Sequence, residues 1–113
     1  MPMTNEEHAQ AIIAALTDKW RETVESLMNS HDYFHTKQNV ESKWKEIQSH
    51  VQALSNTSDL SADAKKTLLD KMKILWNASH ILSSRTDYQV APANEIKAFY
   101  GKLSGPSKPG MQR

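Results

Sequence analysis

The chain has 113 residues, of which 38% are hydrophobic, and a formal net charge of +1. A chain of this length forms one domain around one hydrophobic core. Its net charge provides no bulk attraction to nucleic acid or to an anionic membrane. Because cysteine is absent, disulfides, thiolate metal sites and cysteine nucleophiles are excluded.

The sequence also indicates where the protein resides. The N-terminal residues lack the basic and apolar regions of a secretory signal. No apolar run approaches the ~20 residues that a membrane-spanning helix requires. We therefore expect a cytoplasmic protein that has no membrane partner.

Residues 4–30 are predicted to form the first helix. Thr4 and Glu7 have the spacing of a capping box, and no Gly or Pro interrupts the segment after them. Apolar residues recur every three or four positions on one side of the helical wheel: Ala9, Ile13, Leu16, Trp20, Val24 and Leu27. This pattern predicts one continuous amphipathic helix of about seven turns.

A second helix is predicted from about Lys37 to Ser55, after a connector at residues 31–35. Its apolar residues have the spacing 4-3-4-3, which is typical of a helix packed against its neighbours at a shallow angle. They are Val40, Trp44, Ile47, Val51 and Leu54. Residues 56–59 are predicted to form a turn, because Asn, Thr, Ser and Asp side chains compete for backbone hydrogen bonds.

The third predicted helix begins after Ser61, whose hydroxyl suits an N-cap, and reaches Leu82. One broad apolar face carries Leu68, Leu69, Met72, Leu75, Trp76 and Leu82. Ile74, Ala78 and Ile81 lie on another side of the same helix. A helix that is apolar on two faces either lies at the centre of a fold or offers its second face to something else.

The C-terminal part is predicted to contain one short helix and a tail. Pro92 favours an extended conformation for the residue before it. Residues 93–103 then carry apolar side chains at helical spacing, namely Ile96, Phe99, Tyr100 and Leu103. The Gly and Pro residues within 105–113 indicate a flexible tail.

Together these elements predict an all-α fold, an antiparallel up-down bundle of three long helices plus a short C-terminal fourth helix. The bundle spans residues 1–104 and the tail spans residues 105–113. Each long helix carries one tryptophan. At a rise of about 1.5 Å per residue the three indoles come close in height, so we expect Trp20, Trp44 and Trp76 to be buried in one layer.

The sequence has no pattern specific enough to indicate catalysis or metal binding. Residues four apart on a helix can present two ligands to one metal, as in the pairs His31 with His35 and Glu46 with His50. The Glu-x-x-His motif of helical di-metal proteins is absent, and Gly-rich phosphate loops and strained nucleophile turns are absent too. We therefore expect no enzyme activity, no cofactor and no metal site.

The second apolar face of the third helix is the candidate functional feature. This face and the fourth-helix stripe comprise Ile74, Ala78, Ile81, Ile96, Phe99 and Tyr100. Either the fourth helix folds back over Ile74 and Ile81, or these residues bind a partner protein or a second copy of the chain. The second possibility predicts a non-enzymatic protein-binding module, such as an adaptor, inhibitor, immunity or chaperone-like protein. Compact helical proteins of this length recur among small bacterial and phage proteins of these classes, which is a likeness of fold alone.

An alternative function is association with nucleic acid through the third helix and the C-terminal tail. The basic residues of this helix are Lys65, Lys66, Lys71 and Lys73, and Arg85 follows them. Asp63 and Asp70 lie among them and dilute the charge, and a solvated helix surface also explains the lysines. Salt separates the two functions, because phosphate contacts weaken steeply as salt rises whereas apolar docking does not.

Removal of residues 105–113 is expected to leave the melting temperature unchanged, because Met111 is the one large apolar side chain in the tail. Thermal unfolding followed by circular dichroism measures this temperature. A clear loss of stability would mean instead that the basic tail docks on the acidic first helix.

Overall fold

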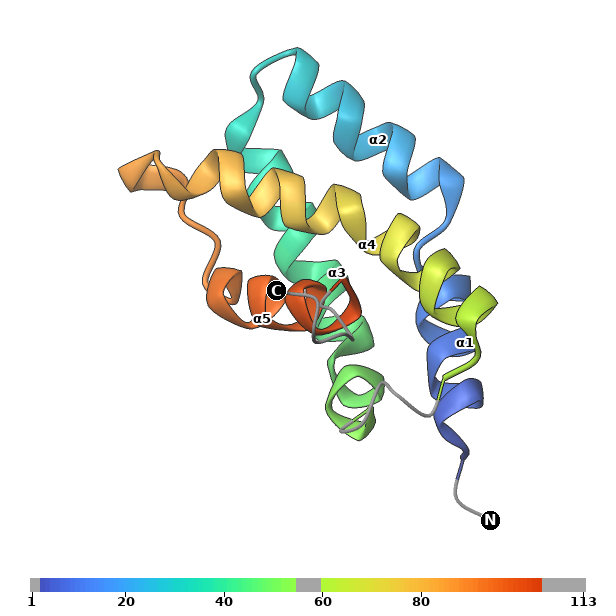
Figure 1. The fold of residues 1–113 in the computed structure, drawn as a ribbon. Helices are drawn as coiled ribbons and strands as arrows, with labels where there is room; N and C mark the ends of the chain where they lie inside the picture. Colours follow the sequence, from blue (N-terminus) through green and yellow to red (C-terminus); the bar gives the residue numbers. More distant parts are fainter. Residues whose placement is uncertain (1–2, 55–59, 105–113) are drawn as a thin grey trace, which may run out of the picture.

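The computed structural model describes residues 3–54 and 60–104, and its regular elements in these ranges are all helical. They are α1 (Asn5–Ala15), α2 (Asp18–Asn29), α3 (Tyr33–Ala53), α4 (Ala62–Ser83), the short 3₁₀ turn η2 (Thr86–Tyr88) and α5 (Ala93–Ser104). Figure 1 shows their arrangement. The all-α class predicted from the sequence is confirmed.

The first predicted helix is in fact two helices, so the prediction of one continuous helix was wrong. Leu16 leaves the helical conformation at φ −92° and ψ 69°, and Thr17 starts α2 with its hydroxyl accepting the Trp20 N–H at 3.0 Å. A Thr followed by Asp is a strong N-terminal signal, because the hydroxyl caps and the carboxylate favours the positive helix end. The Lys43 ammonium binds the Ala15 carbonyl at 2.8 Å and so satisfies one free acceptor at the end of α1.

The predicted connector at residues 31–35 is shorter in the structure: the chain turns at His31 and Asp32, and α3 begins at Tyr33. His31 has a positive φ of 61°. Its N–H bonds the Met28 carbonyl at 3.1 Å, and the Asp32 N–H bonds the Leu27 carbonyl at 2.8 Å. This pair of bonds is a Schellman motif with His31 in the left-handed position that glycine favours. The Asp32 carboxylate then accepts the His35 N–H at 3.2 Å and begins α3 four residues before the predicted start near Lys37.

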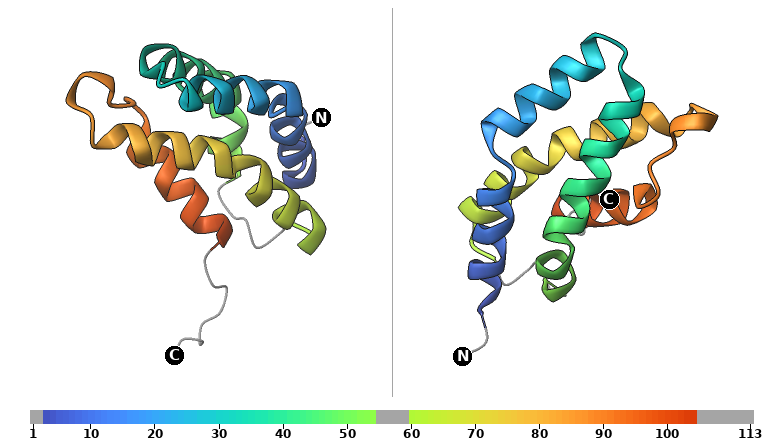
Figure 2. Two further views of the ribbon diagram at one scale, coloured as in Figure 1. Left: turned by 90° about the horizontal axis from the view of Figure 1, so that it is seen from above. Right: turned by 180° about the vertical axis from the view of Figure 1, so that it is seen from behind.

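Helix α4 is central, since it packs against α1, α2, α3 and α5. In the three views α4 lies between α2 and α5, and α3 crosses it at a steep angle (Figures 1 and 2). The packing of the helices is that of a bundle, but the predicted antiparallel up-down arrangement of three long helices is not confirmed, because the first of them is divided and α3 and α4 cross. Eight residues of α4 are buried, namely Ala64, Leu68, Met72, Ile74, Leu75, Ala78, Ser79 and Leu82. A helix that is apolar on two faces has been enclosed by its own chain.

The three tryptophans do not form the predicted layer. Only Trp44 is buried, at 3% exposure, and Trp20 and Trp76 are partly buried. Trp44 contacts Phe99 edge-on at 6.4 Å between ring centroids, and no ring contact within the described ranges joins two indoles. The prediction was wrong because equal height along parallel helices has no meaning where helices cross.

Helix α5 ends at Ser104, which is also the last residue that the structure describes. The predicted tail, residues 105–113, lies outside the described residues, as does the predicted turn at residues 56–59. No helix in the described ranges combines the length and the apolar character that crossing a membrane requires.

Replacement of His31 by glycine is expected to raise the free energy of unfolding by about 1 kcal/mol, because a residue with a Cβ is strained in the left-handed conformation and glycine is not. Urea denaturation measures the change. The matched control is His35→Gly in the first turn of α3, which should lower stability by about 1 kcal/mol because glycine disfavours helix. Equal destabilisation by the two changes would contradict the role given to His31.

Candidate binding surface on α4 and α5

The six residues predicted to form a binding face do not lie on one exposed surface. Four of them are buried: Ala78 and Ile96 at 0% exposure, Phe99 at 4% and Ile74 at 7%. Ile81 is 37% exposed, and Tyr100 is partly buried. Most of the predicted face therefore belongs to the hydrophobic core. The two residues that reach the surface are Tyr100 and Ile81.

Ile74 lies on the side of α4 that faces α2. It shares a hollow of about 390 Å³ with Arg21 and Glu25 of α2. Asp18 at the start of α2 also accepts a hydrogen bond from the Lys71 ammonium at 3.1 Å, and this bond and charge lower the pKa of Asp18. Neither alternative considered for Ile74 from the sequence, the fourth helix or a partner, included α2.

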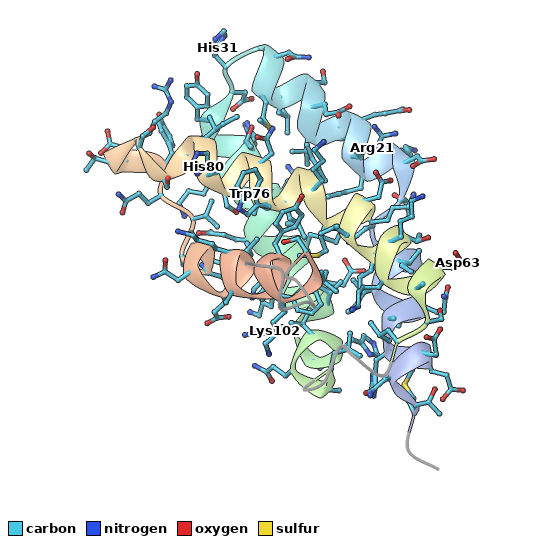
Figure 3. All side chains as sticks on the ribbon, viewed as in Figure 1. Arg21, His31, Asp63, Trp76, His80 and Lys102 are labelled. Atoms are coloured by element: carbon cyan, nitrogen blue, oxygen red, sulfur yellow. The ribbon has the colours of Figure 1, made fainter. Side chains whose placement is uncertain are left out.

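On the side of α4 next to α5, three aromatic rings form a stack. The Trp76 and His80 rings lie 5.2 Å apart at an interplanar angle of 4°. The Tyr100 ring from α5 lies 5.2 Å from Trp76 at 17°. Trp76 and His80 are four residues apart, on neighbouring turns of α4 (Figure 3). The stack thus joins α4 to α5 at the surface, and each ring pair contributes about 0.5–1.5 kcal/mol beyond its buried area.

Two hollows with lysine side chains lie beside this stack. The larger, of about 580 Å³, is lined by Lys66, Thr67, Leu69, Asp70, Lys73 and Tyr100. The smaller, of about 140 Å³, is lined by Trp76, Ser79, His80, Ser83, Ala93, Asn94 and Lys97. We give the name α4–α5 surface to the lysine, aromatic and leucine side chains that line one hollow or the other and are exposed or partly exposed: Lys66, Leu69, Lys73, Trp76, His80, Lys97 and Tyr100. Lys66, Lys73 and Lys97 outnumber Asp70, so this surface is positively charged.

A further hollow of about 380 Å³ lies between α3 and α5, and it is lined mainly by apolar side chains with Trp44 and Phe99 among them. The Trp44 indole N–H donates to the Glu95 carboxylate at 3.1 Å, and the Gln48 amide lies 3.5 Å from the same oxygen. The buried indole donor beside this hollow therefore already has a partner.

The other ionisable contacts join segments of the fold. The Asp32 carboxylate receives the His35 ring and backbone N–H groups, which lower the pKa of Asp32. Partial burial raises the pKa of Glu41, but bonds from the Ala91 N–H at 2.9 Å and the Lys37 ammonium at 2.8 Å outweigh it and leave this pKa lowered. Glu41 thereby ties α3 to the segment before α5.

The histidines considered as metal ligands are engaged elsewhere. The His31 ring meets Tyr33 edge-on at 5.8 Å, and the His35 ring is paired with Asp32 at 2.8 Å. His50 lies against His8 of α1, with 2.9 Å between their Nδ1 atoms. Within the described ranges no three His, Asp or Glu residues gather as a metal site would need.

The sequence did not reveal the aromatic stack, because Trp76 was assigned to the core with the other tryptophans. A signal was nevertheless present, since Trp76 and His80 have the i,i+4 spacing that places two side chains together on a helix surface. The contribution of Tyr100 depends on how α5 packs, which no local pattern gives.

Comparisons of this chain with protein-family models, with curated proteins and with solved structures found no match. No relative therefore supplies a function. The chemistry of the α4–α5 surface is the basis for one.

The substitutions Ile74→Ser and Ile81→Ser are expected to lower the stability of the fold by different amounts. Ile74 is buried against α2, so Ile74→Ser should cost about 2–4 kcal/mol of stability through the cavity and the buried hydroxyl. Ile81→Ser should cost less than about 1 kcal/mol, because Ile81 already contacts water. Urea denaturation of the two variants tests the difference, and equal losses would contradict this assignment of the two faces.

Proposed function

We propose that this chain is a non-enzymatic protein-binding module that docks a partner on the α4–α5 surface. The observation that carries the proposal is the stack of Tyr100, Trp76 and His80 at the surface. Tryptophan and tyrosine are enriched among the residues that dominate binding energy at interfaces, because they bury much area at little cost in side-chain entropy.

Charge complementarity defines the partner. Lys66, Lys73 and Lys97 are exposed beside the stack, and Asp70 is the single acidic side chain in the two hollows. An acidic segment would be attracted to such a surface and oriented on it. The apolar wall of the larger hollow, from Leu69 and Tyr100, suits an apolar side chain of the same segment. The partner we propose is a protein segment that has acidic residues next to an apolar one.

Binding of single-stranded nucleic acid is a second candidate, since lysines beside aromatic rings are a common feature of such sites. Two observations favour the protein partner. The Trp76 ring already stacks with two partners of its own chain, His80 and Tyr100, and a base would have to compete with these contacts. Lys71, one of the lysines considered for nucleic acid, is paired with Asp18.

Selection from a random peptide library displayed on phage tests the protein-binding proposal without a known partner. Peptides enriched on the purified protein are expected to carry Asp or Glu next to an apolar or aromatic residue. The double change Lys73→Glu with Lys97→Glu should weaken binding of a synthetic enriched peptide by about tenfold, the effect of turning two surface attractions into repulsions.

The matched control is Lys19→Glu with Lys45→Glu, which makes the same charge change at exposed positions of α2 and α3. This variant should bind the peptide as the original protein does. Enriched peptides without acidic residues, or equal weakening by both double variants, would contradict the proposed surface. If a labelled single-stranded oligonucleotide binds instead, with a steep loss as salt rises, the second candidate is the function.

A further inference from the structure

The smaller hollow beside the aromatic stack lies between the C-terminal half of α4 and the first turn of α5. Trp76, Ser79, His80 and Ser83 line it from α4, and Ala93, Asn94 and Lys97 line it from α5. Its volume of about 140 Å³ admits a group of a few atoms, since one water occupies about 30 Å³ of the liquid. No acidic residue of the described ranges lines it.

Ser79 is the first polar group of this hollow that needs an explanation. It is 3% exposed, and its Oγ is buried without a hydrogen-bond partner in the part of the chain that the structure describes. Other helical hydroxyls donate to a carbonyl of their own helix, as Thr23, Thr36 and Ser83 do. Because an unpaired buried hydroxyl destabilises the fold, Ser79 is a donor for which a ligand would provide the missing partner.

The start of α5 adds donors on the other side of the hollow. The Ala93 N–H bonds the Val90 carbonyl and the Ile96 N–H bonds the Pro92 carbonyl. The N–H groups of Asn94 and Glu95, between them, have no acceptor in the described ranges. Pro92 precedes the helix and has no side-chain oxygen to cap it. The unpaired amides carry the partial positive charge of a helix N-terminus, which favours anions.

Lys97 completes the positive character of the hollow. It lies one turn into α5, at i+4 from Ala93 and i+3 from Asn94, and therefore on the same side of the helix as the residues that line the hollow. Lys97 has no ion pair in the described ranges. Among the described residues, the hollow thus combines a buried hydroxyl donor, unpaired backbone amides and an ammonium, and no carboxylate lines it.

We propose that this hollow is a binding site for a small oxyanion, a carboxylate or a phosphate group. The Ser79 hydroxyl, the Asn94 and Glu95 amides and the Lys97 ammonium are its donors, and Trp76 contributes an apolar wall. The hollow shares Trp76, His80 and Lys97 with the α4–α5 surface, but a free anion can occupy it without a docked protein partner. An anion here would neutralise the start of α5 and bind it to α4.

Titration with sodium phosphate and sodium acetate, followed by ¹H–¹⁵N NMR at neutral pH, tests the site. Sodium chloride at matched ionic strength is the reference. We expect saturable shifts of the Asn94 and Glu95 amide signals with phosphate that chloride does not produce. Saturation by acetate as well shows that the site accepts a carboxylate, and saturation by phosphate alone shows that it is selective for a phosphate group.

Two variants assign the donors. Ser79→Ala should weaken phosphate binding several-fold and leave the melting temperature the same or higher, because it removes a hydroxyl that has no partner among the described residues. Lys97→Gln should also weaken binding, and Lys102→Gln, the same change at an exposed lysine of α5 that lines the hollow beside α3 instead, should not.

Shifts that are the same in phosphate and in chloride would overturn the proposal, and water would then be the partner of the hydroxyl. A Ser79→Ala variant that binds phosphate normally and unfolds at a lower temperature would also overturn it, because the hydroxyl would then be structural.

Discussion

The fold depends on the burial of apolar side chains on more than one side of α4. Its buried residues point in two directions, with Leu68, Leu75 and Leu82 facing the main core and Ile74 facing α2. Full burial of one such side chain contributes about 1.5–3 kcal/mol, so leaving either side in water would cost a large part of a small domain's stability. Helices on both sides of α4 are the consequence, α2 on one and α5 on the other (Figure 1).

The break between α1 and α2 makes this enclosure possible. A straight helix over residues 4–30 would continue in the direction of α1, whereas the turn at Leu16 and Thr17 sends α2 along one side of α4 (Figure 1). Polar contacts fix the two halves: the Lys43 ammonium holds the end of α1 to α3, and Asp18 holds the start of α2 to Lys71 of α4. Each bond satisfies a group that the break itself leaves free, a terminal carbonyl and a first-turn carboxylate.

The part of the α4–α5 surface that belongs to α4 is a strip that neither α2 nor α5 covers. Lys66, Lys73 and His80 are spaced seven residues apart, so they lie on one side of α4, and this side is exposed because the apolar residues of α4 lie on its other sides. Tyr100 comes over the edge of this strip from α5 and stacks on Trp76, so the aromatic contact is both a packing contact and the border of the exposed surface. The first turn of α5 then lies beside Ser79, which places a helix N-terminus, a lysine and a buried hydroxyl around one hollow.

The sequence by itself determined the helical class, the caps at Thr4 and Ser61, and the extent of α5, because these depend on local spacing and on side chains within one turn of the backbone groups they bind. It also indicated that α4 is apolar on two faces. Only the tertiary structure decided that α2 covers Ile74, that the tryptophans lie apart and that Tyr100 reaches Trp76. These three features result from the turn at Leu16 and from the steep crossing of α3 and α4. The turn and the crossing depend on contacts between residues far apart in the chain, and the periodicity of a single helix carries no information on such contacts.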